Sequence, residues 1–140
     1  MYRRILVAID GSEASRRALQ AALELARALG ATLHAIGVEE RLPYYAATLG
    51  EVQEAKAQAN AFFQEVMASA QLLAAEYGLA LTTEVRAGNA AQQIIEAARL
   101  GGFDLIVLGA RGHGFLQHFL LGSTTDRVVD HAPCSVLVVR

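Results

Sequence analysis

Glycines and hydroxyl side chains are concentrated in one stretch of the sequence, between residues 105 and 126. A run of branched aliphatic residues leads to Gly109, Gly112 and Gly114, and Gly122 is then followed by three hydroxyl residues. Glycine has no Cβ, so backbone N–H groups in such a turn can approach a ligand closely. Free N–H groups, the positive end of a helix dipole and hydroxyl donors all favour phosphate. The stretch therefore predicts a phosphate-binding loop, although the same glycines could be ordinary loop and cap residues.

The charges in this stretch limit how a phosphate could be held. Ser123 is expected to begin a helix, because Asp126 three residues later completes a capping-box pattern. Asp126 would repel a phosphate unless it caps the helix or binds a metal ion, and capping is the favoured role. There is no G-x-x-x-x-G-K-[ST] loop, so no lysine neutralises the phosphates. Arg111 and a Mg²⁺ or Mn²⁺ ion are the candidates for that role. A dinucleotide fingerprint is excluded, because Gln117 occupies its third glycine position.

Apolar runs alternate with amphipathic stretches along the whole chain, which predicts a parallel sheet covered by helices on both faces. Ligands bind such sheets beyond the strand C-termini, where the strand order reverses. Asp10 and Gly109 each end a predicted strand, so they would share one crevice if their strands are neighbours. The expected strands are 4–10, 31–38, 79–86, 103–108 and 134–139, and the expected helices are 13–29, 51–77, 90–100 and a segment from 123 to about 131.

The longest predicted helix carries one apolar stripe. Its apolar residues follow three-and-four spacing, which favours burial against the sheet over a coiled coil or a cofactor site. The stripe consists of Val52, Ala55, Ala59, Phe62, Val66, Leu73 and Tyr77.

Support for catalysis is weak. His113 and His118 flank the glycine loop and could act as bases, but no set of nucleophile, base and orienting residue is visible. We therefore predict no catalytic residue. Asp10 is expected either to contact a ligand or to cap the helix that follows, and ligand contact is favoured because it stands at the expected switch point.

Length and composition bound the class of protein. The chain of 140 residues is expected to form a single domain, residues 1–140, and 54% of its residues are hydrophobic. No apolar run approaches the roughly 20 residues of a membrane span, and the N-terminus lacks a signal-peptide pattern. A net charge of −2 gives no support for nucleic-acid binding. With one cysteine, Cys134, the chain is expected to be cytoplasmic.

The last predicted strand is uniformly apolar from Val136 to Val139. At a sheet edge it would either be covered by the chain itself or pair with another strand. We favour pairing with the same strand of a second copy, which gives a two-fold homodimer.

Three segments together resemble the universal stress protein (UspA) family over nearly the whole chain. They are the opening strand and acidic turn at 4–12, the stretch from Asp104 to Ser123 and the closing helix and strand at 127–139. The middle stretch matches the G-x2-G-x9-G-[S/T] signature of the family's nucleotide-binding subclass. The resemblance implies an α/β fold with a five-stranded sheet of order 3-2-1-4-5, an adenine nucleotide alpha hydrolase-like, flavodoxin-like three-layer sandwich. It also implies dimerisation through the last strand.

The resemblance also assigns site residues. The turn at 8–10 would flank the nucleoside, the end of the second strand would meet the adenine, and the glycines would admit the ribose and phosphates. Gly37 stands where a larger apolar residue is common in the family. The implied nucleotide-binding residues are Ala8, Ile9, Asp10, Val38, Leu108, Gly109, Arg111, Gly112, Gly122, Ser123, Thr124 and Thr125.

The sequence therefore leads to a hypothesis of an ATP-binding stress-response module with slow hydrolysis at most. ADP or AMP could replace ATP, and Mg²⁺ or Mn²⁺ would be held mainly by the phosphates. One alternative is a low-activity ATP hydrolase. The other is a nucleotide-independent interaction module that recruits an unknown protein partner through the loop around Pro43.

Overall fold

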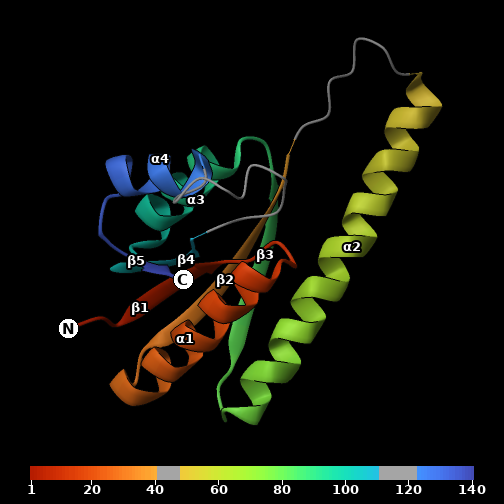
Figure 1. The fold of residues 1–140 in the computed structure, drawn as a ribbon. Coiled ribbons are helices and arrows are strands. Elements are labelled where there is room, and N and C mark those ends of the chain that lie inside the picture. Colours follow the sequence, from red (N-terminus) through yellow and green to blue (C-terminus); the bar gives the residue numbers. More distant parts are fainter. Residues whose placement is uncertain (41–47, 111–122) are drawn as a thin grey trace.

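The computed structural model describes residues 1–40, 48–110 and 123–140. Within them, a five-stranded parallel sheet of order β3-β2-β1-β4-β5 lies between two layers of helices (Figure 1). This confirms the fold class and the strand order expected from the sequence. In chain order the elements are β1 (Arg4–Ala8), α1 (Glu13–Leu29), β2 (Thr32–Glu39), α2 (Leu49–Glu76), β3 (Leu81–Ala87), α3 (Ala90–Gly101), β4 (Leu105–Gly109), α4 (Ser123–His131) and β5 (Ser135–Val139).

The central strand β1 is buried on both faces. Ile5 and Val7 pack in the cluster that contains α1 and part of α2, whereas Leu6 packs with residues of α3 and α4 on the opposite face. All three side chains are fully buried. Successive side chains of a strand point to opposite faces, so a strand covered on both sides needs a continuous apolar run.

Local capping signals fix the ends of several helices. The side chain of Ser12 accepts a hydrogen bond from the backbone N–H of Ser15 at 3.1 Å and caps α1. Asn89 caps α3 in the same way, through the N–H of Gln92 at 3.0 Å. Gly30 ends α1 in the left-handed conformation that favours glycine. These caps confirm the predicted starts of α1 and α3 and the predicted end of α1.

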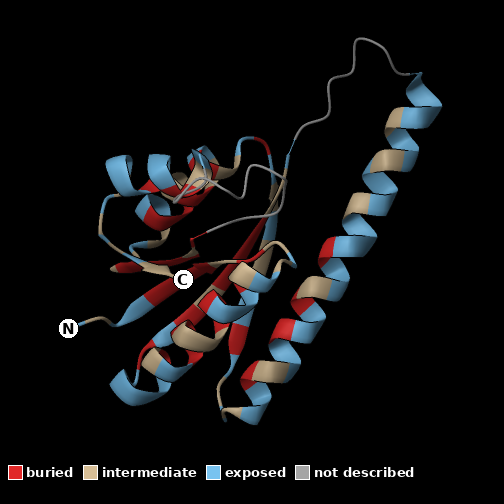
Figure 2. Cartoon of the chain, viewed as in Figure 1, coloured by how far each residue is buried: buried red, intermediate tan, exposed pale blue. Residues whose placement is uncertain are grey.

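The prediction for the long helix α2 was only partly right. The sequence predicted one buried stripe from Val52 to Tyr77, but the buried side chains begin at Phe63, and Phe62 is 43% exposed. A helix of 28 residues is about 42 Å long, whereas strands of five to eight residues span only about 17–26 Å. The first half of α2 therefore extends beyond the sheet, with mostly exposed residues (Figures 1 and 2). The buried residues of α2 are Phe63, Met67, Ala70 and Ala74.

Candidate functional site

The carboxyl ends of β1 and β4 lie side by side. The two strands pair in parallel, with Ile5 opposite Leu105 and Val7 opposite Val107. On its other side β1 pairs with β2, so the order of the strands reverses between β1 and β4. The turn that contains Asp10 therefore follows one strand of the switch point, and Gly109 ends the other. Open α/β sheets bind ligands in this position.

The Asp10 carboxylate shapes its own turn. Its Oδ1 accepts a hydrogen bond from the backbone N–H of Ser12 at 2.9 Å, and the N–H of Asp10 donates to Ser15 Oγ at 3.2 Å. Ser12, rather than Asp10, is the residue that caps α1. Asp10 is half-buried. The helix-capping alternative for Asp10 is thereby excluded, and its carboxylate is held at the sheet edge by the turn.

Gly109 brings β4 into close contact with the first turn of α1. A Cβ on residue 109 would lie 2.7 Å from the carbonyl oxygen of Ala14, closer than carbon and oxygen atoms can pack. Packing against α1 therefore favours glycine at position 109, independently of whether a ligand approaches the backbone there. The same contact holds the N-terminus of α1 against the end of β4.

Helix α4 approaches the same edge from the other side of the sheet. Its described part begins at Ser123, and Thr125 Oγ1 donates a hydrogen bond to the carbonyl oxygen of Gly109 at 3.1 Å. Thr125 is 4% exposed, whereas Ser123 is exposed and Thr124 is half-buried. Thr125 thus ties the start of α4 to the end of β4, and the other two hydroxyl residues remain accessible.

The other predicted contact residues divide by burial. Ile9 and Leu108 are buried in opposite core clusters, so their side chains face the core. Ala8 and Val38 are half-buried and pack against the cluster of α3 and α4. Arg111, Gly112 and Gly122 lie outside the described residues, as do His113 and His118.

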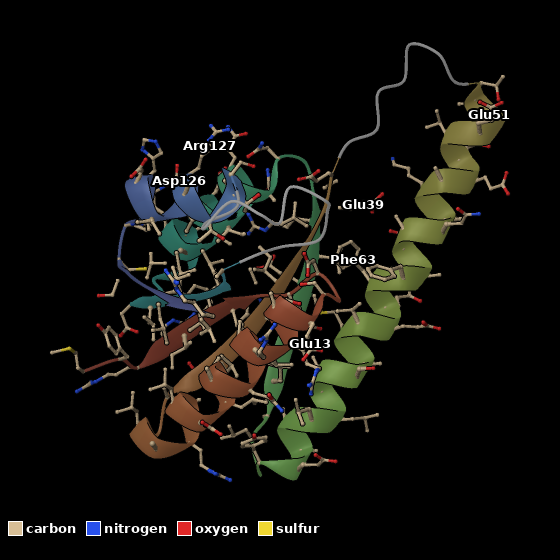
Figure 3. The ribbon with its side chains drawn as sticks, in the orientation of Figure 1. Glu13, Glu39, Glu51, Phe63, Asp126 and Arg127 are labelled. Carbon is tan, nitrogen blue, oxygen red and sulfur yellow. The ribbon has the colours of Figure 1, made fainter. Side chains whose placement is uncertain are left out.

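Phe63 packs near this edge, although the sequence pattern placed Phe62, and not Phe63, on the buried face of the long helix. An ideal Cβ on Gly37 would lie 2.7 Å from Phe63 Cδ1 and 2.9 Å from the Met67 methyl carbon. The ring of Phe63 therefore fills the space above Gly37, between α2 and the sheet (Figure 3). A side chain larger than glycine at position 37 would therefore need Phe63 and Met67 to move. Phe62 and Phe63 follow each other in an alanine-rich helix, so spacing alone did not decide which of them faces inward.

A polar network runs along β3 beside this edge. His34 Nε2 lies 2.9 Å from Glu84 Oε1, and Arg86 Nε donates to Glu84 Oε2 at 2.9 Å. Burial raises the pKa of Glu84, but the hydrogen bonds from Arg86 and His34 outweigh it, so the net pKa lies below its ordinary value. Because Arg86 is in register with Val38, the network ends next to the predicted adenine contact.

The described residues contain no group of three or more histidine, cysteine, aspartate or glutamate side chains placed to hold a metal ion. No helix in the described part of the chain is long and apolar enough to cross a membrane.

This sheet, with the Asp10 turn, the end of β4 and the start of the described part of α4 meeting at its switch point, defines an α/β protein of the class that binds ligands at the carboxyl edge of its strands. The chain belongs to the universal stress protein family, whose family model matches residues 1–140.

Individual relatives support the same assignment. A universal stress protein of Thermus aquaticus is 38% identical over 150 residues, with both chains fully covered. Another from Methanocaldococcus jannaschii is 33% identical over 141 residues, covering 100% of this chain and 83% of the relative. The solved universal stress protein UspA of Lactobacillus plantarum is 34% identical and has a TM-score of 0.91, with 99% and 98% of the two chains covered.

Two more distant structures share the fold and contain nucleotides. One is a universal stress protein in complex with cAMP, at 24% identity and a TM-score of 0.77, covering 99% of this chain and 97% of the other. The other is the Archaeoglobus fulgidus universal stress protein in complex with dAMP, at 21% identity and a TM-score of 0.68, covering 99% and 98%.

Proposed function

We propose that this protein binds an adenine nucleotide, namely ATP, ADP or AMP, at the carboxyl edge of β1 and β4, and acts as a regulatory binding module in a stress response. The observation that carries the proposal is the convergence of three elements at this edge. The Asp10 turn follows β1, whose carboxyl end lies next to that of β4. Thr125 joins the start of α4 to the same edge through its hydrogen bond to Gly109. The nucleotides in the cAMP and dAMP complexes of family members with this fold agree with the proposed ligand class.

In this proposal the phosphates and the nucleoside of the nucleotide contact different kinds of protein group. The first N–H groups of α4 and the accessible hydroxyls of Ser123 and Thr124 bind the phosphates, together with Arg111. The Asp10 carboxylate accepts from the ribose or the adenine, and Val38 contacts the base. Mg²⁺ or Mn²⁺ is held mainly by the phosphates and offsets their charge. Hydrolysis is slow at most.

The proposed assembly is a homodimer in the cytoplasm. Strand β5 forms an edge of the sheet, and its Leu137 is 37% exposed. An apolar edge strand with free backbone groups is a template for pairing with a second strand. Pairing of β5 with its copy across a two-fold axis would cover Leu137 and the free backbone groups together.

Isothermal titration calorimetry with ATP, ADP and AMP, with and without Mg²⁺, tests the binding proposal. We expect saturable binding that is weakened about tenfold in Asp10→Asn, since asparagine keeps the acceptor for the Ser12 N–H but loses the charge. The matched control is Glu13→Gln, because Glu13 is the first residue of α1, three positions after Asp10, and is exposed beside Arg16. Absence of binding at about millimolar nucleotide would overturn the proposal, and an unchanged affinity in Asp10→Asn would remove Asp10 from the site.

A further inference from the structure

A concave surface lies between α3 and α4, on residues that the nucleotide proposal does not use. Its volume is about 270 Å³. Ala91 and Ile95 supply apolar lining, Ala91 is buried, and Ile95 packs against the core. We call this surface the α3–α4 groove; its lining residues are Ala91, Gln92, Ile95, Glu96, Arg99, Arg127 and His131.

Basic side chains predominate at the rim of the α3–α4 groove. Arg99 comes from α3, and Arg127 and His131 come from α4, where a spacing of four residues places them on the same face. Glu96 is the one acidic lining residue, and its carboxylate lies 3.7 Å from Arg99 in an exposed pair. The rim is therefore positive on a chain whose net charge is −2.

Arg127 is the cation that local structure does not explain. Arg99 and His131 stand in the last turns of their helices, where positive charge is favourable without any ligand. Arg127 lies in the middle of α4, on the side that faces away from the sheet (Figure 3). Among the described residues its guanidinium makes no hydrogen bond or ion pair, and neither flanking aspartate, Asp126 or Asp130, lines the groove.

We propose that the α3–α4 groove is a docking surface for an acidic, amphipathic peptide segment of a partner protein. The segment would place carboxylates against Arg127 and Arg99, which can hold them in bidentate pairs, and an apolar side chain against Ile95. Exposed ion pairs contribute little by themselves, so a free anion gains almost nothing from this open surface. A peptide adds apolar contact and several linked carboxylates, and this combination matches the lining. The proposal is independent of nucleotide binding.

The test uses a synthetic peptide of about 14 residues built from Leu-Glu-Glu-Ala repeats, titrated into ¹⁵N-labelled full-length protein at low salt. We expect amide shifts to be confined mainly to residues 91–99 and 127–131, and to decline as added salt screens the charges. Arg127→Gln should weaken binding at least about fivefold with an unchanged melting temperature, because this side chain is exposed. The control Arg17→Gln removes another exposed arginine, on α1, and should leave the affinity unchanged.

Four results would overturn the proposal. The peptide could leave these amides unshifted, or the same repeat with lysine in place of glutamate could bind equally well. Inorganic phosphate alone could reproduce the shifts with equal affinity, which would make the surface a small-anion site. Concentration-dependent self-association that Arg127→Gln abolishes would instead make a second copy of this chain the occupant.

Discussion

The hydroxyl of Thr125 donates to the carbonyl oxygen of Gly109 across 3.1 Å, so the first turn of α4 is fastened to the last residue of β4. Between these elements, residues 111–122 lie outside the described part of the chain. Both ends of the predicted phosphate loop are thus held at fixed positions by one hydrogen bond and by the packing of Gly109 on Ala14. This edge of the sheet and its neighbours lead to four predictions, and β5 leads to a fifth.

Thr125 and Thr124 should have different roles although they are adjacent. Thr125→Val removes the hydrogen bond to Gly109 without changing the shape of the side chain, and should lower the free energy of unfolding by about 1 kcal/mol. Thr124→Val should weaken ATP binding while leaving stability unchanged within about 0.5 kcal/mol. Urea denaturation and calorimetry on both variants measure the two effects. The opposite pattern would show that Thr125 is the ligand contact.

Gly109→Ala should destabilise the protein by about 1–3 kcal/mol, because the new Cβ would meet the backbone of Ala14, which cannot move aside as a side chain could. Gly50→Ala is the matched control. Gly50 lies in α2, and a methyl group added there would have nothing within 4 Å, so alanine should be neutral or slightly stabilising. Equal effects of the two substitutions on urea denaturation would contradict the packing role of Gly109.

Gly37 and Phe63 should show strong energetic coupling. Gly37→Ala forces the Phe63 ring to shift and should cost about 1–3 kcal/mol. Phe63→Leu leaves a gap and should also be destabilising. The double variant should be more stable than the sum of the single losses predicts, because the methyl group then occupies part of that gap. A double-mutant cycle from thermal unfolding checks this, and strict additivity would show that the two positions do not share one space.

Glu84 should make stability depend on acid pH. Its pKa is lowered in the folded state, so the stabilisation is present above the ordinary value of 4.5 and is lost as pH falls through the lower folded value. Glu84→Gln should therefore cost less than about 1 kcal/mol at pH 7, and the difference from wild type should shrink below pH 4.5. Denaturation midpoints across this range measure the effect. Glu54→Gln, at an exposed site on α2, should show no such trend.

Leu137→Lys should dissociate the proposed homodimer. The substitution places a charge on the exposed β5 edge, where pairing would bury it. Light scattering after size exclusion should give the dimer mass for wild type and the monomer mass for the variant. Lys56→Leu, on the first half of α2, changes charge and hydrophobicity elsewhere and should leave the mass unchanged. A monomeric wild type, or a Leu137→Lys variant that stays dimeric, would exclude pairing through β5.

The sheet was predictable because β1, β4 and β5 are short, mostly aliphatic runs and because residues such as Ser12 and Asn89 mark where helices begin. The position of the candidate site was predictable in part. In a parallel sheet the turns that follow two neighbouring strands at the switch point lie close together, independent of the residues in those turns. The bond from Thr125 was not, because three consecutive hydroxyl residues carry no signal for which of them turns inward. Nor was the inward position of Phe63, because every aromatic or aliphatic residue in α2 fits some helical stripe.

The excess length of α2 divides this helix into two populations of backbone amides. From Phe63 onward the hydrogen bonds are shielded by the core, so their exchange with deuterated solvent requires a large opening of the fold. Before that residue the turns project past the sheet, and their amides can exchange by local fraying from the Thr48 cap. The boundary between slow and fast exchange therefore falls inside one continuous helix rather than at its end.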